Sequence, residues 1–548
     1  MTTDRPRTIL RNGRIWCGET IGCVEALAIS GKRVLAAGRA RDIEALIEPS
    51  SRVIDLGGRL ALPGFCDAHM HLLPLGLAQR ELDLRPEVAP DMAALLARLR
   101  ERARTVATGE WIFGRGYDHF LLPERRHPTR DELDAAAPDN PVYLKRCCGH
   151  MGVANARALA LAGIGDDAPD PDGGHIDRDA DGHPTGLLQE RAQAPVFDAM
   201  PAPGEDALVQ AIEDGGRLLI ERGITAAMDA GVGMRAGIAE YDAYARAQRE
   251  GRLPLRAYLC FVGGPGGVAE EAHARGLVTG RGDARLKVGP VKLFTDGSAG
   301  GRTAAMREPY LGDDAGSDGG RGILCFGDDE LADLARDYHA KGFQLAVHAI
   351  GDAAIDQTLA AVRGALAAAP DGERRHRIEH CGFIQPDQIE EMKRLGMIPV
   401  PQPVFMRQFG DAYLDVLGEA RPAAAYPMAS WIRAGLHPAA STDAPVSDFD
   451  PFLNLHAAVT RRTAAGRVLG AGERIGVAEA LTTMTWNGAH ASFDENERGT
   501  LAPGKLADLA VVSIDLLACA PEEILEARCD LTILDGEIVF DRSGELAG

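Results

Sequence analysis

Leu62-Pro63-Gly64-Phe65-Cys66-Asp67-Ala68-His69-Met70-His71 is an apolar run that ends in two histidines one residue apart. The apolar part predicts a buried strand. Side chains at positions i and i+2 of a strand point to the same face, so His69 and His71 project the same way from its end. Two imidazoles in this arrangement can hold one divalent metal ion. The alternative is a pair of ordinary, satisfied histidines, and the residues downstream decide between the two.

Beyond this run, the middle of the chain alternates between short apolar runs and Ala-, Leu- and Arg-rich stretches of helical period, such as residues 205–221. Eight runs qualify as core strands: 61–66, 224–229, 255–261, 288–294, 343–348, 376–380, 397–402 and 436–441. Alternating strands and helices imply parallel βα units, and eight such units close a barrel. The sequence therefore predicts an α/β protein with a (β/α)8 TIM-type barrel.

Both ends of the chain are rich in β-prone residues. Hairpin signals stand at Asn12-Gly13, at Gly31-Lys32 and, near the other end, at Asp535-Gly536. We expect residues 1–60 and 497–548 to form one small β-sandwich domain together, with the barrel at 61–496.

The gap of about 150 residues between the first two predicted strands exceeds an ordinary crossover. It predicts an inserted subdomain, at about 80–200, that covers the barrel mouth. The Gly- and Asp-rich segment 297–322 predicts a long loop that acts as a lid.

The composition narrows the class of protein. A formal net charge of −21 argues against nucleic acid and against an anionic membrane as partners, because both need clustered Lys and Arg. The 10 cysteines include no CxxC pair, residues 1–6 are polar, and no stretch reaches the roughly 20 apolar residues that span a bilayer. We expect a reduced, cytoplasmic protein.

Polar residues stand at the ends of five of the predicted strands. They are His69, His71, Lys292, His348, His380 and Asp443. The carboxyl ends of barrel strands meet at one face, where the active site is built, so these side chains are expected to converge. Each has an ordinary alternative, such as a helix cap, a core histidine or a solvated lysine. Their joint occurrence in this order favours a metal centre.

The chemistry of a metal centre needs these residue types. Imidazole and carboxylate bind zinc, and an open position leaves room for water, whose pKa falls toward ~7 on the metal. Asp443 could then take a proton from this water and pass it to a leaving nitrogen. Lys292 is unusual because a free ammonium repels metals. Carboxylated by carbon dioxide, it becomes an anion that can bridge two ions.

Several motifs together resemble one known family. They are Pro63 to His71, Val291-Lys292-Leu293-Phe294-Thr295-Asp296-Gly297-Ser298, His348-Ala349-Ile350-Gly351-Asp352, His376-Arg377-Ile378-Glu379-His380, Ser441-Thr442-Asp443-Ala444-Pro445 and Gly499 to Leu509. In combination they are similar to the metal-dependent amidohydrolase superfamily, in the branch called amidohydrolase family 3, which includes N-acyl and N-substituted formamide hydrolases. The resemblance implies the barrel and a β-sandwich made by the termini.

The resemblance also implies roles for the strand-end residues. His69 and His71 would bind a first divalent metal, usually Zn2+, and His348 and His380 a second one. Lys292, carboxylated on its side-chain nitrogen, would bridge the two, and Asp443 would ligate the first metal and act as general base. Some relatives work with one metal, and the sequence leaves one or two open.

The chain departs from the family at one place. Relatives commonly carry Asp-Gly-His after the strand that follows the Pro128-Thr129-Arg130 motif, and this chain has Cys147-Cys148-Gly149-His150 there. His150 remains a candidate donor to substrate. Cys148 as a nucleophile is an alternative, although a metal centre already supplies one.

Other candidates for substrate binding are spread along the chain. They are Trp111, His150 and Glu190 in the insert, and Arg302 and Arg407, which could clamp a substrate carboxylate. Packing of Trp111 in the core of the insert, and solvation of the two arginines, are the alternatives.

The first hypothesis for the function is a metal-dependent hydrolase that cleaves a non-peptide carbon–nitrogen amide bond, N-acyl or N-formyl, with metal-activated hydroxide. The alternatives are a cyclic amide, an ester or lactone, a ring deamination, or a non-catalytic scaffold. The expected partners are a small-molecule substrate and, from the habit of the family, a second copy in a homodimer.

Overall fold

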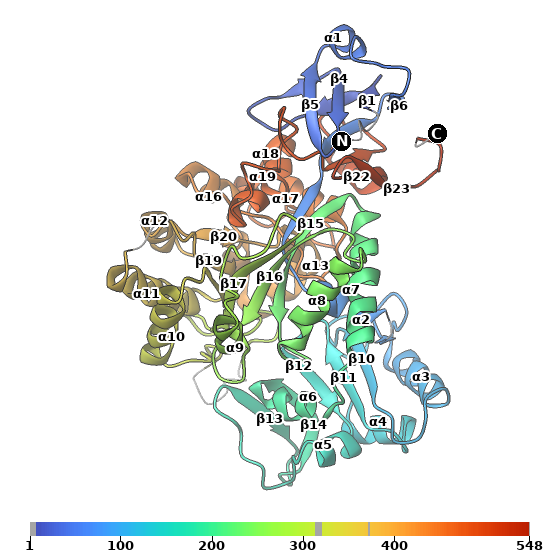
Figure 1. Ribbon diagram of the computed structural model, residues 1–548. Helices are drawn as coiled ribbons and strands as arrows, with labels where there is room; N and C mark the ends of the chain where they lie inside the picture. The colour runs from blue at the N-terminus through green and yellow to red at the C-terminus, as the bar shows by residue number, and fades with distance from the viewer. Residues whose placement is uncertain (1–6, 80, 313–319, 371–372, 547–548) are drawn as a thin grey trace.

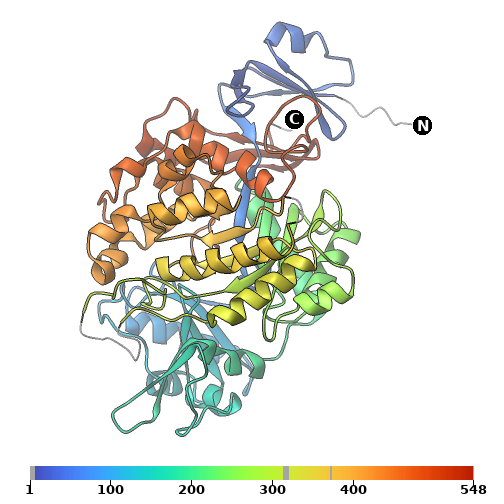
Figure 2. The ribbon, with the colours of Figure 1, turned by 90° about the vertical axis from the view of Figure 1, so that its left-hand side faces the viewer.

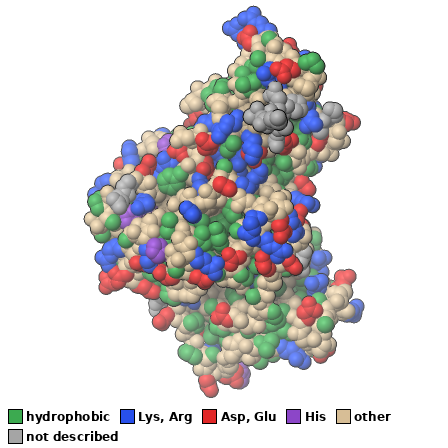
Figure 3. All heavy atoms as spheres, in the orientation of Figure 1, with side chains coloured by type: hydrophobic (Ala, Val, Ile, Leu, Met, Phe, Trp, Pro, Cys, Tyr) green, Lys and Arg blue, Asp and Glu red, His purple; other side chains and the backbone are tan. Residues whose placement is uncertain are grey.

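The computed structural model describes residues 7–79, 81–312, 320–370 and 373–546. It has three parts along one long axis (Figure 1): sheets made from both ends of the chain at the top, a barrel in the middle, and an inserted sheet with its helices at the bottom. Part of the predicted lid, residues 313–319, lies outside the described residues. On the face shown in Figure 3, acidic and basic side chains are interspersed.

The barrel is a sheet of seven parallel strands in the order β20-β19-β18-β17-β16-β15-β8. The strands are β8 (Phe65–Met70), β15 (Ile224–Val232), β16 (Arg256–Val262), β17 (Leu286–Phe294), β18 (Leu345–Ala349), β19 (Arg377–His380) and β20 (Ile398–Val400). Six of the eight predicted core strands, from the second to the seventh, are therefore confirmed, and with them the TIM-type barrel.

Helices surround this sheet (Figure 1 and Figure 2). They are α2 (Leu72–Ala78), α7 (Glu205–Ile220), α8 (Ala239–Arg249), α9 (Ala269–Ala274), α10 (Asp328–Ala340), α11 (Asp352–Ala368), α12 (Pro386–Arg394), α13 (Pro403–Gln408), α14 (Gly410–Leu417), α15 (Ala420–Ala424), α16 (Met428–Ala434), α17 (Pro451–Thr460), α18 (Val477–Thr483) and α19 (Trp486–Ala491), with the short turn η2 (Ala471–Glu473). Figure 2 shows α10 and α11 lying side by side over the barrel. None of the helices in the described ranges is long and apolar enough to cross a membrane.

The eighth predicted strand, 436–441, is not a strand, although the segment occupies the place of one. The amides of Ala439 and Ser441 donate to the carbonyls of Pro399 and Pro401, each at 3.0 Å. At its far end, the amide of Asp443 donates to the carbonyl of His69 at 2.8 Å. Prolines lack the N–H that a ladder needs in return, so the segment closes the barrel without regular pairing.

The first predicted strand, 61–66, is divided between two sheets. β7 (Leu60–Pro63) belongs to the terminal sheet, and the barrel strand β8 begins only at Phe65. Gly64 lies at the junction, where a Cβ atom would come within 2.2 Å of the Thr225 hydroxyl. The apolar run therefore contributes one strand to each of two sheets, and it is buried in both.

The terminal sheets combine the two ends of the chain. One has the order β5-β4-β1-β6 and the other β23-β22-β21-β7-β2-β3. Their elements are β1 (Thr8–Arg11), β2 (Arg14–Trp16), β3 (Cys23–Val24), β4 (Ala26–Ser30), β5 (Arg33–Gly38), α1 (Ala40–Glu44), β6 (Arg52–Asp55), β21 (Leu509–Val512), η3 (Pro521–Glu526), β22 (Cys529–Leu534) and β23 (Glu537–Asp541). The hairpins at Gly31-Lys32 and Asp535-Gly536 are confirmed. The one at Asn12-Gly13 is wrong: β1 and β2 pair in different sheets, so this turn carries the chain from one sheet to the other.

Between β8 and α7 the chain forms a sheet in the order β13-β14-β12-β11-β10-β9. Its elements are β9 (Leu82–Asp83), α3 (Met92–Ala103), β10 (Ile112–Tyr117), α4 (Arg130–Ala136), β11 (Val142–Arg146), β12 (Met151–Ala154), α5 (Ala156–Leu161), β13 (Gly174–Arg178), β14 (Pro184–Glu190), η1 (Arg191–Gln193) and α6 (Ala194–Ala199). We refer to this part as the insert. It has hydrophobic clusters of its own, separate from the core of the barrel.

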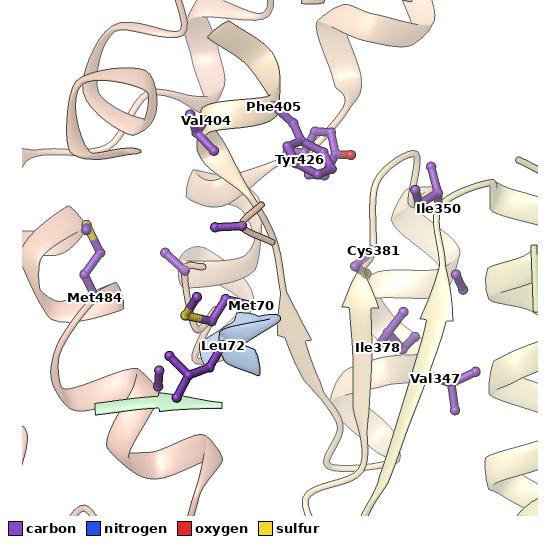
Figure 4. Close-up of a cluster of buried hydrophobic side chains, with 14 of the residues drawn as sticks. Met70, Leu72, Val347, Ile350, Ile378, Cys381, Val404, Phe405, Tyr426 and Met484 are labelled. Atoms are coloured by element: carbon purple, nitrogen blue, oxygen red, sulfur yellow. The ribbon is translucent and has the colours of Figure 1, made fainter. Parts of the chain in front are cut away.

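One large hydrophobic cluster fills the space between the barrel strands and their helices. Figure 4 shows part of it, with Met70 and Leu72 near the end of β8 and Val347 on β18. Because side chains alternate along a strand, packing Met70 and Val347 into this cluster turns the neighbouring His69 and His348 toward the barrel axis. Packing of the core thus orients the candidate ligands.

Candidate metal centre and active site

The strand-end residues predicted from the sequence do meet at the carboxyl end of the barrel. His69 lies on β8, Lys292 on β17, His348 on β18 and His380 at the end of β19, and Asp443 follows the segment that closes the barrel. Each of these five is at most 6% exposed. Polar side chains are seldom buried this deeply without partners, so the contacts among them are informative.

The donor atoms of three candidates form a compact set. One ligand atom each from His69, His380 and Asp443 lies within 4.8 Å of the other two. Asp443 Oδ1 is 3.3 Å from His69 Nε2 and 3.2 Å from His71 Nε2. This buried oxygen makes no well-directed hydrogen bond. An unpaired carboxylate oxygen facing imidazole nitrogens is the donor set of a divalent cation, and the residues therefore fit one.

The two remaining candidates lie beside this set. Lys292 Nζ is 3.4 Å from His69 Nε2. The His348 ring is 4.4 Å from the His380 ring, centroid to centroid, but His348 Nε2 faces the Asp296 carboxylate at 3.2 Å. The structure thus gathers His69, His71, Lys292, His380 and Asp443 closely, and places His348 next to them with Nε2 turned to another partner.

Two residues that sequence reasoning left without a role hold His69 in place. Glu379 accepts a short hydrogen bond from His69 Nδ1 and is held by Arg377 Nε at 2.7 Å. This contact directs His69 Nε2 toward the centre, since the proton stays on Nδ1. Burial opposes ionisation of Glu379, but Arg377 and His69 outweigh it and bring its pKa to about 2. The alternation in Arg377-Ile378-Glu379 could have signalled a shared face.

Asp296 is a third residue that the sequence left without a role. Its carboxylate accepts hydrogen bonds from the amides of Ala305, Ile350 and Gly351, at 2.8 to 3.0 Å. It therefore ties the loop after β17 to the loop after β18, next to His348. Asp296 stands four residues after Lys292 in the quoted motif, but only the structure shows which amides it binds.

Burial controls the charge of the centre. It lowers the pKa values of Lys292, His71, His348 and His380, because a charged amine or imidazole loses its hydration there. Neutral imidazoles are the form that binds metal, and a neutral lysine amine is the form that can react with carbon dioxide. The environment thus favours the protonation states that a metal centre requires.

The backbone at two of the candidates is strained. His380 has φ 67° and Asp443 φ 60°, in the left-handed region that non-glycine residues seldom adopt. Such strain persists only where the surroundings enforce it, and it concentrates at functional sites. The helix caps that the sequence left open are also decided: His348 and Asp443 do not cap the following helices, since α11 is capped by Gly351 and α17 by Asp450. The two ordinary alternatives, a cap for His348 and a cap for Asp443, are thereby excluded.

A pocket opens onto His348, His380 and Asp443. Its lining comes from the barrel end, the insert, the loop after β17 and α13 to α14: His348, His380 and Asp443; Arg146, Cys148 and His150; Ser298 to Gly300; and Phe405, Phe409 and Tyr413. One wall is thus polar and one aromatic, which suits a small amphipathic molecule. Arg146, Phe405 and Tyr413 were not singled out from the sequence.

His150 and Glu190 form a pair in the pocket wall. His150 Nδ1 lies 2.8 Å from Glu190 Oε2, and the His150 ring is 5.2 Å from the His348 ring. Burial disfavours the charged imidazole, but Glu190 outweighs it and raises the pKa of His150 to about 9. At neutral pH this pair therefore presents a protonated imidazole beside the metal centre.

Cys148 also lines the pocket. Burial opposes ionisation of the thiol, but the Arg146 guanidinium and His150 lower its pKa below the ordinary value. The role of Cys148 as a nucleophile stays a prediction. Its position shows that the replacement of the family acid falls inside the pocket.

Three predicted substrate residues do not reach the pocket. Trp111 packs against a hydrophobic cluster of the insert, immediately before β10. Arg302 follows Ser298 to Gly300 in the loop and extends toward Gly312 instead. Arg407 is on α13, two residues after Phe405. Phe405 lines the pocket, and Arg407 lies on another side of the same helix. The alternative raised for Trp111, packing in the core of the insert, is the arrangement observed.

Comparisons with known proteins identify the family of the chain. The model of the amidohydrolase family matches residues 52–540. YtcJ of Bacillus subtilis is 32% identical over 504 residues, which cover 90% of this chain and 92% of YtcJ. The N-substituted formamide deformylase of Arthrobacter pascens is 30% identical over 534 residues, covering 95% and 96% of the two chains.

Among solved structures, an uncharacterized metal-dependent hydrolase from Pyrococcus horikoshii superposes with a TM-score of 0.75 at 29% identity, covering 94% of this chain and 99% of its own. The resemblance stated from the motifs is thereby confirmed over nearly the whole chain. The chain belongs to the amidohydrolase family.

Proposed function

We propose that the protein hydrolyses the amide bond of a small N-acyl or N-formyl compound. The observation that carries the proposal is the compact donor set of His69, His380 and Asp443, with the unpaired Asp443 Oδ1, where His380 and Asp443 also line a pocket. The similarity to an N-substituted formamide deformylase over 95% of the chain supports this choice of bond.

We assign the metal ligands as His69, His71, His348, His380, Asp443 and a carboxylated Lys292. A divalent cation there, for which we propose Zn2+, supplies Lewis acidity and lowers the pKa of water toward ~7. The buried position of the Lys292 amine beside His69 supports its carboxylation, because burial lowers the pKa of the amine and carbamate formation needs the free base.

The chain's own groups then divide the work. Asp443 Oδ1, which has no hydrogen bond of its own, accepts a proton from the attacking water and returns it to the leaving nitrogen. Protonated His150, held by Glu190, donates to the substrate carbonyl oxygen as negative charge develops on it. The aromatic wall of Phe405 and Tyr413 excludes water from the rest of the substrate.

The first test is metal content, measured by elemental analysis on tag-free protein purified without chelators. One to two equivalents of zinc or a similar ion, and turnover of N-formyl or N-acyl substrates, are expected. In the Lys292→Ala variant we expect the loss of one equivalent and partial recovery of activity with added short carboxylic acids. Normal binding of two ions by that variant would show that the bridge is wrong. No metal after reconstitution with bicarbonate would contradict the proposal itself.

Two further expectations belong with this proposal. All ten cysteines are free, which supports a reducing, cytoplasmic location. A homodimer with a small-molecule substrate as its other partner is expected from the family, and sedimentation would test it.

A further inference from the structure

Three basic side chains meet at the border between the insert and the barrel. Arg115 on β10 and Lys145 on β11 are register partners on neighbouring strands. Arg235 follows the carboxyl end of β15. We refer to Arg115, Lys145 and Arg235 as the basic triad. Figure 1 shows β10 and β11 on the side of the insert that faces the barrel.

Lys145 and Arg235 approach each other over one aromatic ring. Lys145 Nζ lies 5.2 Å and Arg235 Cζ 5.8 Å from the centre of the Phe197 ring. Arg235 also lies 5.1 Å from the Phe113 ring. Cation–π contacts hold both charges in place but neutralise neither of them.

The negative charge nearby is not enough to balance the triad. Glu81 is the closest carboxylate, and its Oε2 is 3.7 Å from Arg115 Nε, beyond hydrogen-bond range. That Nε is buried and makes no hydrogen bond. Asp83 is occupied by Arg85, through contacts of 3.0 and 2.7 Å. Within the described residues, neither Lys145 Nζ nor the Arg235 guanidinium makes a hydrogen bond or an ion pair with any side chain.

Three buried arginines show the contrast. Arg146, Arg256 and Arg377 each bind a carboxylate at 2.7 to 2.8 Å. Three half-buried cations around one distant carboxylate repel one another, and an anion placed among them removes that repulsion. The triad therefore has the electrostatics of a site for an anion.

The triad lies beside the pocket. A Cβ at Gly149, between the pocket residues Cys148 and His150, would be 3.8 Å from both Lys145 Nζ and Val446 Cγ2, and Val446 also lines the pocket. On the other side, Gly231 of β15 packs near His71 Nδ1, and Arg235 follows four residues later. Lys145 thus lies next to the pocket wall, and Arg235 follows the strand that passes His71.

We propose that the basic triad is a subsite for the carboxylate of the substrate, so that the protein acts on acidic amides such as N-acyl amino acids and not on neutral N-acyl amines. The proposal rests on the proposed function for the bond that is cleaved. It gives the triad the role that the sequence had suggested for Arg302 and Arg407, both of which lie elsewhere.

Matched ligand pairs test the subsite on the metal-loaded enzyme. We would measure binding, by calorimetry, of N-acetylglycine against N-acetylglycinamide and of N-acetylphenylalanine against its amide. Wild type is expected to prefer the acid by roughly 10-fold to 100-fold, the range for charge-assisted hydrogen bonds. Lys145→Met and Arg235→Met should each remove most of this preference, and Lys393→Met, an exposed lysine on α12, should keep it.

The outcomes separate the two proposals. No preference for the acid in either pair, or a preference that survives both Lys145→Met and Arg235→Met, would overturn the subsite, because the carboxylate would then bind elsewhere, for example at the metal. Acetate and inorganic phosphate as competitors distinguish a carboxylate subsite from a phosphate one: stronger competition by phosphate would also overturn it. Thermal melting confirms that each variant is folded.

Hydrolysis of the same pairs is a separate measurement. Preferred binding of the acids without turnover of any amide would reject the proposed function and leave the subsite standing. Equal turnover of acids and amides would reject the subsite and leave the proposed function standing.

Discussion

The two ends of the barrel both bury charged side chains, but they treat them in opposite ways. At the amino end, Arg256 binds Asp508 at 2.7 Å and Asp535 at 2.5 Å, and Lys287 binds Asp494, which also binds Arg498 at 3.2 Å. At the carboxyl end, Asp443 Oδ1 and His71 Nδ1 are buried without a hydrogen bond.

This difference separates groups that stabilise the fold from groups that bind a ligand. Arg256 on β16 joins the barrel to Asp508, immediately before β21 of the terminal sheet, so the paired charges at the amino end link two parts of the chain. Unpaired groups at the carboxyl end stabilise nothing by themselves. In barrel enzymes the carboxyl face is the catalytic one. In this barrel the buried groups without hydrogen bonds lie at that same face.

The largest effect is expected at the carboxyl end. The Asp443→Asn variant should lose about 10^2-fold to 10^4-fold in turnover, because the amide cannot accept the proton of the attacking water. The variant should still bind metal through its histidines, and elemental analysis controls for this. Steady-state kinetics with the best amide substrate measures the effect. Unchanged turnover would remove Asp443 from the mechanism.

The counterpart at the amino end should change stability and not activity. The Asp508→Asn variant removes one of the two carboxylates that bind the buried Arg256 and leaves Asp535. We expect a loss of about 3 kcal/mol in the free energy of unfolding. Denaturant titration measures it. Asp333→Asn, which breaks the exposed Arg336 pair, is the matched control and should cost under about 1 kcal/mol. Equal losses in both variants would mean that the buried link is not special.

A smaller effect is expected for Glu379, which is paired with Arg377 and orients the candidate ligand His69. Glu379→Gln removes the charge that fixes the proton on His69 Nδ1, and metal affinity should fall about 10-fold to 100-fold. Competition with a chelating indicator measures the affinity, and the melting temperature of the metal-free protein controls for the loss of the Arg377 contact. The same affinity as wild type would mean that packing alone orients His69.

The smallest effect concerns acid stability at the amino end. Burial opposes ionisation of Asp494, but Arg498 and Lys287 outweigh it, so its pKa lies below the ordinary value of about 4. The pair's contribution to stability is therefore present above pH ~4 and disappears as the pH falls through the lower, folded-state pKa. Unfolding free energies measured from pH 6 to pH 3 should fall less steeply for Asp494→Asn than for wild type. Equal slopes would contradict this assignment.

Much of the fold and the donor set could be predicted from the sequence, because both depend on local patterns. Six core strands were identified from apolar runs between helical stretches, and His69, Lys292, His348 and His380 from their positions at strand ends. The first strand was predicted too early in the chain, since 61–66 includes only the first two residues of β8, which ends at Met70. Its bounds were wrong because one apolar run is buried by two sheets in succession. The eighth strand was wrong because Pro399 and Pro401, which face it on one side, lack the N–H that regular pairing needs.

The sequence by itself determined the barrel, the family and the residues that converge at its carboxyl end, since periodicity and motif order are properties of the chain. Only the tertiary structure decided which charges are paired. Glu379 on His69, Asp508 on Arg256, and the unbalanced Arg115, Lys145 and Arg235 involve residues brought together from distant elements. Pairing depends on distances of a few ångströms across the fold, and no local pattern records them.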